Sequence, residues 1–197
     1  MGKKLWILAS CVCTGISILA AVIFLAVPRA MVPSTTSYPP KLVALVRPLL
    51  GDSLCSFQIV RHYRQNQSSS GMLWLHLKNF VATRYVNMFW NKLDRVRTCL
   101  DLLHHPRSQF PIGFYPTAQI TYTNSVEQLN AAQILTVLSM WSSSRQNPWC
   151  HPDRVINLIR VYSKKLPYET QKELEQVTTQ DIQLNLQPSP IKCTESG

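Results

Sequence analysis

Carboxylates that could exchange a proton with a substrate are few in this sequence. General acid–base chemistry needs an ionisable group held within hydrogen-bond reach of the reacting proton. No Asp or Glu precedes Asp52, and between Gly51 and Ser125 the only acids are Asp52, Asp94 and Asp101. A proton-transfer site in this part of the chain must therefore use one of these three side chains.

Other common catalytic and metal-binding patterns are absent from the sequence. It contains no Gly-rich phosphate loop, no nucleophile elbow and no zinc-type cysteine spacing. The neighbouring His104 and His105 would point to different faces of a helix, which disfavours a shared metal ion. We therefore expect no resident cofactor.

Four cysteines, Cys55, Cys99, Cys150 and Cys193, lie outside the apolar N-terminal segment. Four cysteines can pair in three ways, and the spacing does not choose among them. A free thiol at any of these positions is also open.

The chain is basic, with 20 Lys and Arg against 10 Asp and Glu and a formal net charge of +10. Such a surface suits anionic partners such as lipid headgroups, pyrophosphates or anionic polymers, or it simply keeps the protein soluble. The charge is spread rather than grouped on one reading helix, and no nucleic-acid motif is visible, so we expect no nucleic-acid partner.

A stretch without charged residues, Leu5–Val27, predicts one transmembrane helix. At about 1.5 Å per residue it is long enough to cross a hydrocarbon core of ~30 Å. It exceeds the apolar core of a usual cleaved signal peptide, and Pro28-Arg29-Ala30 is a poor cleavage site. Lys3 and Lys4 favour a cytoplasmic N-terminus.

The chain is thus expected to consist of a cytoplasmic tail (1–4), a signal anchor (5–27), a Pro-, Ser- and Thr-rich tether (28–40) and an exported part. The exported part would lie outside the cytoplasm, where disulfides can form. Asn66 begins an N-x-S sequon, which would be a glycosylation site only in a eukaryotic secretory pathway.

The exported part reads as mainly α-helical. Apolar residues recur at helical spacing in stretches that include Lys41–Leu50 (broken at Pro48), Ser53–Arg64, Met72–Val81, Asp94–Leu103 and Glu169–Val177. In Met72–Val81, Leu73, Leu77 and Phe80 share one face, which predicts a core helix. The aromatic stretch 84–90 suits either a membrane interface or a core.

The segment Asn124–Pro167 predicts two helices. Ser125 and Gln128 have capping-box spacing, so the first should begin there. Pro152 and Asp153 suit the first turn of the second. Pro167 should end it.

The sequence of this segment, SVEQLNAAQILTVLSMWSSSRQNPWCHPDRV, resembles the closing segment of the peptidoglycan glycosyltransferase (transglycosylase) family. The resemblance implies a single lysozyme-like helical domain at 41–166, behind one N-terminal transmembrane helix and followed by a polar C-terminal tail (167–197). Pro116, in the stretch before the closing segment, argues for a more broken helix there than in the family.

A second stretch, QSSSGMLWLHLKNF, resembles a motif that lines the family's cleft. Matching positions imply substrate-binding roles for Gln67, Ser70, Lys78 and Asn79. A lysine with hydroxyl and amide groups suits a pyrophosphate, because charge-assisted hydrogen bonds to phosphate oxygens are strong. Gly71 replaces the family's threonine, and Trp74 and Leu75 replace its glutamine pair.

Both catalytic glutamates of the family are substituted. The first motif falls near residues 43–47, where Val46 and Arg47 stand at the acidic positions. The second glutamate falls at Thr98 or Cys99, and Asp101 is the only nearby carboxylate that could replace it. Whether the chain is an enzyme therefore stays open.

The resemblance implies a membrane-anchored protein of a bacterial inner membrane with a periplasmic domain. It would bind, or also polymerise, lipid-linked disaccharide precursor in cell-wall synthesis, in contact with membrane lipid and other cell-wall enzymes. A divalent cation is implied by the family alone. The alternatives are an inactive relative that acts as a binding or scaffold protein, and an unrelated single-pass membrane protein with a disulfide-bonded helical ectodomain.

Overall fold

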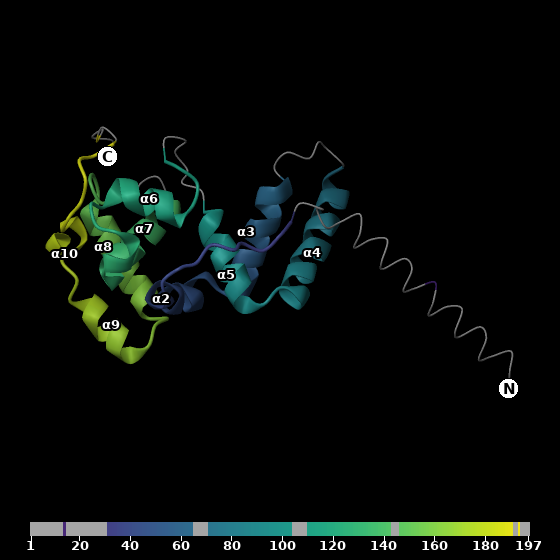
Figure 1. The fold of residues 1–197 in the computed structure, drawn as a ribbon, viewed down its shortest axis with the longest axis horizontal. Helices are drawn as coiled ribbons and strands as arrows, with labels where there is room; N and C mark the ends of the chain where they lie inside the picture. The colour runs from purple at the N-terminus through teal and green to yellow at the C-terminus, as the bar shows by residue number, and fades with distance from the viewer. Residues whose placement is uncertain are drawn as a thin grey trace, which may run out of the picture. The chain divides into compact units, whose positions relative to one another are not determined.

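A computed structural model describes residues 14, 31–64, 71–103, 110–142, 146–190 and 193 (Figure 1). The described part is mainly α-helical, which confirms the coarse fold class. The chain divides into two compact units. Unit 1 comprises Met1–Pro33 and Asp52–Arg95, and unit 2 comprises Ser34–Gly51 and Val96–Gly197.

Unit 1 is built on two helices, α3 (Asp52–Arg64) and α4 (Met72–Phe89), which pack against each other. Buried polar groups join the two helices. Ser56 Oγ donates a hydrogen bond to Asn87 Oδ1 at 2.5 Å, and Arg95 Nη1 donates to the same oxygen at 2.7 Å. These bonds satisfy polar groups that would otherwise be costly to bury.

Unit 2 surrounds the apolar helix α7 (Ala131–Ser142), of which every residue from 131 to 140 is buried. A helix that is apolar on all sides needs neighbours all round. Here α2, α6, α8, α9 and α10 supply them (Figure 1). Their bounds are α2 Pro40–Leu50, α6 Phe114–Thr121, α8 Pro152–Ser163, α9 Tyr168–Glu175 and α10 Thr179–Gln183. Helix α5 (Lys92–Asp101) begins in unit 1 and ends in unit 2.

The predicted start of the first helix in 124–167 is wrong. Only a short 3-10 helix, η1 (Val126–Gln128), follows Ser125, whose side chain forms no cap. The reciprocal capping box lies further along and begins α7. Asn130 Oδ1 accepts from Gln133 N at 2.8 Å, and Gln133 Oε1 accepts from Asn130 N at 3.0 Å. Asn is as good an N-cap as Ser, so composition did not favour one register.

The second helix of that segment begins as predicted, with Pro152 and Asp153 in the first turn of α8. Its predicted end at Pro167 is wrong, since α8 ends at Ser163. A hydrogen-bonded turn follows, with Leu166 N donating to Ser163 O at 2.9 Å. Pro167 instead precedes α9 as its N-cap.

Two prolines disturb their helices less than predicted. Pro48 lies inside α2, near its end, and does not break it. Pro116 lies in the first turn of α6, where a backbone N–H has no partner within the helix in any case. Proline therefore costs little at that position.

The predicted helix Met72–Val81 is present, but it extends to Phe89 as α4. Its predicted core face is wrong, because Leu73, Leu77 and Phe80 are 86%, 45% and 59% exposed. The buried residues of α4 are Ala82 and Val86, in its C-terminal half.

The segment 167–197 contributes to the core of unit 2 through Leu174, Val177 and Ile182. Cys193 forms a disulfide with Cys150. Cys55 and Cys99 are disulfide-bonded as well, so none of the four cysteines is a free thiol. The predicted domain bounds stay a prediction.

The predicted anchor, 5–27, lies outside the described residues except for Thr14. In the described ranges, no single helix is long and apolar enough to cross a membrane. The pair Pro40–Leu50 and Cys55–Tyr63 meets that criterion together, by length and composition only.

Candidate functional site

Asp101, the carboxylate that could replace the family's second glutamate, lies at the C-terminal end of α5 and faces residues 34–38 of the predicted tether. Its Oδ2 accepts hydrogen bonds from Ser34 Oγ and, at 2.9 Å, from Thr36 Oγ1. Its Oδ1 accepts from the hydroxyl of Tyr38 at 2.5 Å. Both carboxylate oxygens are thus engaged by side chains of residues 34–38.

Tyr38 is held as a neutral donor in this arrangement. Burial, then the hydrogen bond to Asp101 and its charge, raise the pKa of Tyr38 far above the usual value of 10.0. Its ring stacks on Tyr115 with 4.9 Å between centroids and meets Phe114 edge-on at 6.4 Å. The tether is therefore packed as well as hydrogen-bonded at this point.

None of the four positions expected for the family's glutamates carries a carboxylate that could accept a proton. Val46 is fully buried, and Arg47 is exposed and cationic. The Thr98 hydroxyl accepts a hydrogen bond from Ser34 N at 2.7 Å, and Cys99 is disulfide-bonded.

Two of the predicted binding residues, Gln67 and Ser70, lie outside the described residues. The other two, Lys78 and Asn79, are neighbours on α4 in unit 1, whereas Asp101 belongs to unit 2. The three described candidates therefore belong to two different units.

Lys78 and Asn79 each have a polar side-chain group that could bind a ligand. The Lys78 ammonium lies 5.2 Å from the centroid of the Trp74 ring, a cation–π contact. The Asn79 Oδ1 atom is buried, with no hydrogen-bond partner among the described residues. A buried unpaired carbonyl oxygen is costly, so Asn79 would gain from a donor.

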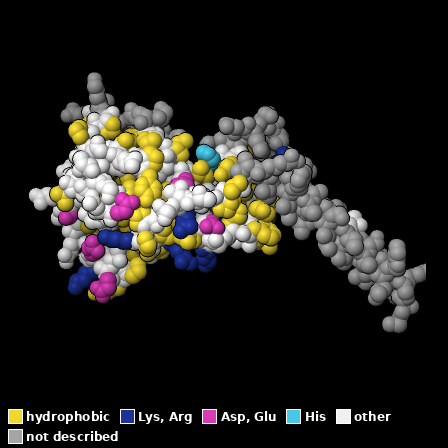
Figure 2. Space-filling view, in the orientation of Figure 1, with side chains coloured by type: hydrophobic (Ala, Val, Ile, Leu, Met, Phe, Trp, Pro, Cys, Tyr) yellow, Lys and Arg dark blue, Asp and Glu magenta, His cyan; other side chains and the backbone are white. Residues whose placement is uncertain are grey.

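An exposed apolar surface covers α4. We call it the α4 apolar surface, and its residues are Met72, Leu73, Leu77, Phe80, Met88 and Phe89. Figure 2 shows hydrophobic side chains gathered over this helix. Arg84 lies among them, with its guanidinium 5.3 Å from the Phe80 ring centroid. Exposed apolar side chains gathered on one helix suit an interaction or membrane surface.

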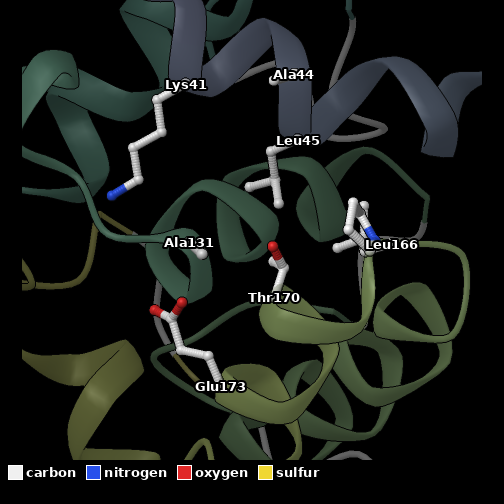
Figure 3. A pocket seen from close by; sticks show the side chains of 8 residues that line it. Lys41, Ala44, Leu45, Ala131, Leu166, Thr170 and Glu173 are labelled. Atoms are coloured by element: carbon white, nitrogen blue, oxygen red, sulfur yellow. The ribbon is translucent and has the colours of Figure 1, made fainter.

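A pocket of about 210 Å³ lies in unit 2 (Figure 3). Its lining comes from α2, the start of α7, the turn before α9, and α9 itself: Lys41, Ala44, Leu45, Ala131, Leu166, Pro167, Thr170 and Glu173. Sequence reasoning singled out none of these as site residues. They come from three distant parts of the chain, so no local motif could have signalled them.

Among the described residues, no group of three His, Cys, Asp or Glu side chains could hold a metal ion. The divalent cation implied by the family resemblance therefore finds no ligand set in this part of the chain.

In its described residues, the protein is mainly α-helical and disulfide-bonded, and it carries an exposed apolar helix, α4, and a small pocket in unit 2. No protein-family model, curated protein or solved structure matches the chain.

Proposed function

We propose that this chain is a membrane-anchored, non-catalytic relative of the peptidoglycan glycosyltransferases that binds lipid-linked disaccharide precursor at the periplasmic face of a bacterial inner membrane. The non-catalytic part of the proposal is supported by the hydrogen bonds that Ser34, Thr36 and Tyr38 donate to Asp101. A general base must reach the proton that it abstracts. The Asp101 carboxylate is already hydrogen-bonded to three hydroxyl groups of its own chain. In the proposal, residues 41–166 correspond to the lysozyme-like domain of the family.

The α4 apolar surface supports contact with lipid. Helix α4 contains no acidic residue, and Lys78 and Arg84 stand among its apolar side chains. Apolar and aromatic side chains with interleaved cations suit the boundary between headgroups and acyl chains, where anionic lipids attract basic groups.

Lys78 and Asn79 are the proposed contacts for the pyrophosphate of the precursor. The ammonium supplies a charge-assisted hydrogen bond to a phosphate oxygen. The Asn79 Nδ2 group can donate beside it, whereas the unpaired Oδ1 would accept from a hydroxyl of the precursor's sugars. No step of the proposal uses a metal ion.

The binding test uses the full chain in lipid nanodiscs with purified lipid-linked precursor. We expect binding without polymer formation, and about tenfold weaker binding by Lys78→Met, equivalent to one lost charge-assisted bond. Lys92→Met, an exposed lysine of the same unit, is the matched control. Polymer formed by the wild type and lost in Asp101→Asn would overturn the non-catalytic assignment, and undiminished binding by Lys78→Met would overturn the binding site.

Lipid contact can be tested separately with a fluorescent amino acid at position 73 and brominated lipids in the nanodisc. We expect strong quenching at position 73 and little at position 161, the site of another exposed apolar residue, on α8 in unit 2. Equal quenching at both positions would contradict the proposed role of α4.

A second candidate is a single-pass membrane protein of unrelated ancestry with a disulfide-bonded ectodomain. The disulfide bonding of Cys55, Cys99, Cys150 and Cys193 is compatible with it. Absence of precursor binding by the wild type, together with glycan on Asn66 in the native protein, would select this candidate.

A further inference from the structure

The pocket in unit 2 combines an apolar floor with polar groups at its rim. Leu45, Ala131 and Leu166 form the floor and are 8%, 3% and 7% exposed. Lys41 of α2 and Glu173 of α9 stand at the rim on opposite sides of Ala131 (Figure 3). A few polar groups converging on an apolar cavity are typical of small-molecule sites.

The two charged side chains at this rim, Lys41 and Glu173, are exposed to solvent, so a ligand would replace water at them. The side chains of Lys41, Thr170 and Glu173 form no hydrogen bond or ion pair with any residue in the described ranges. Lys41 and Glu173 carry opposite charges and do not meet across the pocket, although each lines it. A ligand that carries both a carboxylate and an ammonium group could form a charge-assisted hydrogen bond with each of these two side chains.

The size of the pocket limits that ligand. About 210 Å³ is below the range of ~300–1,000 Å³ typical of drug-sized ligands. The apolar floor favours a compact hydrocarbon group in the centre, since burying such a group is favourable.

We propose that this pocket binds a free α-amino acid with a small aliphatic side chain. Lys41 pairs with its carboxylate, Glu173 pairs with its ammonium, and Leu45 and Leu166 contact its side chain. The Thr170 hydroxyl is within the same rim and can hydrogen-bond either charged end. This site is independent of the precursor-binding function proposed above, because it lies in unit 2 and uses none of the same residues.

The test titrates the full chain in nanodiscs with L-leucine, glycine, 4-methylpentanoate and isopentylamine by calorimetry. We expect L-leucine to bind, and each of the other three to bind about tenfold more weakly or not at all, because each lacks the side chain or one charge. Lys41→Met and Glu173→Gln should each weaken L-leucine binding about tenfold. Ala44→Phe, which fills the pocket without changing charge, should abolish it.

Lys172→Met and Glu169→Gln are the matched controls, because both residues are exposed on α9 and neither lines the pocket. No heat with L-leucine would overturn the proposal, and so would equal losses in the control and pocket variants. Binding of 4-methylpentanoate as tight as that of L-leucine would overturn the zwitterion assignment in favour of a simple carboxylate. The circular dichroism of each variant, unchanged from wild type, separates a lost site from a lost fold.

Discussion

The hydroxyl of Tyr38 donates a hydrogen bond to Oδ1 of Asp101 at 2.5 Å, across 63 positions of sequence. Ser34 and Thr36 donate to the other oxygen of the same carboxylate. One side chain at the end of α5 therefore orders the segment 34–38, and its role in the described structure is to position the tether.

Replacing Asp101 should destabilise unit 2. Asp101→Ala leaves three hydroxyl donors without their shared acceptor, at a cost of about 1–3 kcal/mol of unfolding free energy. Urea denaturation with the disulfides intact measures this cost. Asp153→Ala, at an exposed acid of α8, is the control and should change stability by at most about 1 kcal/mol. Equal midpoints for wild type and Asp101→Ala would show that the three hydrogen bonds are not formed in solution.

Stability should fall at alkaline pH because of two buried tyrosines. Burial is the main cause that raises the pKa of both Tyr38 and Tyr122 above the usual 10.0. Below pH ~10, folded and unfolded chains both carry neutral tyrosine, and the contribution is fully present. Above it, the unfolded chain loses these protons first, so each tyrosine lowers stability by about 1.4 kcal/mol per pH unit.

Urea denaturation midpoints measured between pH 8 and 11 test whether stability falls as the pH rises. Tyr38→Phe should make stability fall less steeply as pH rises, by about 1.4 kcal/mol per pH unit, whatever its effect on stability at neutral pH. Tyr168→Phe is the control, because Tyr168 is 72% exposed. A decline that is equally steep in wild type and Tyr38→Phe would contradict the assignment to Tyr38.

Gly113 should not tolerate a side chain. Its φ is +101°, and an added Cβ would lie 3.0 Å from the backbone oxygen of Asp101. Gly113→Ala should therefore destabilise the protein by about 1–3 kcal/mol. Gly71→Ala is the control, since nothing lies within 4 Å of a Cβ there, and it should change the unfolding free energy by about 0.5 kcal/mol or less. Similar thermal midpoints for the two variants would refute this prediction.

The disulfide between Cys150 and Cys193 spans 43 positions of sequence. Replacing both cysteines by alanine should lower stability by about 2–4 kcal/mol, because the unfolded chain regains the freedom of that loop. Hydrogen exchange should also speed up at Gln187, whose N–H donates to Thr121 O at 2.9 Å. Unchanged exchange at Gln187 would mean that the tail is held without the disulfide.

Most helices could be predicted from the sequence, because apolar spacing is a local signal. Ser53–Arg64 and the start of α8 at Pro152 match the structure closely. The capping box could not be assigned to its register, since Ser125 with Gln128 and Asn130 with Gln133 have the same spacing. Only tertiary packing of α7 distinguishes the two.

The sites were less predictable than the helices. The face of α4 that carries Leu73 and Phe80 has the periodicity of a core helix, and periodicity does not state whether a neighbour covers it. The bonds from Ser34 and Thr36 to Asp101 join segments more than sixty positions apart. No spacing rule connects a hydroxyl-rich tether with one distant carboxylate.

The division of the chain into two units has a consequence for cutting it. The sequence passes from one unit to the other after Pro33, after Gly51 and after Arg95. Gly51 is exposed, at φ 60°, and is a natural place for a single nick. A nick there would give fragments 1–51 and 52–197, each carrying parts of both units, so the halves should remain associated and refold only when mixed.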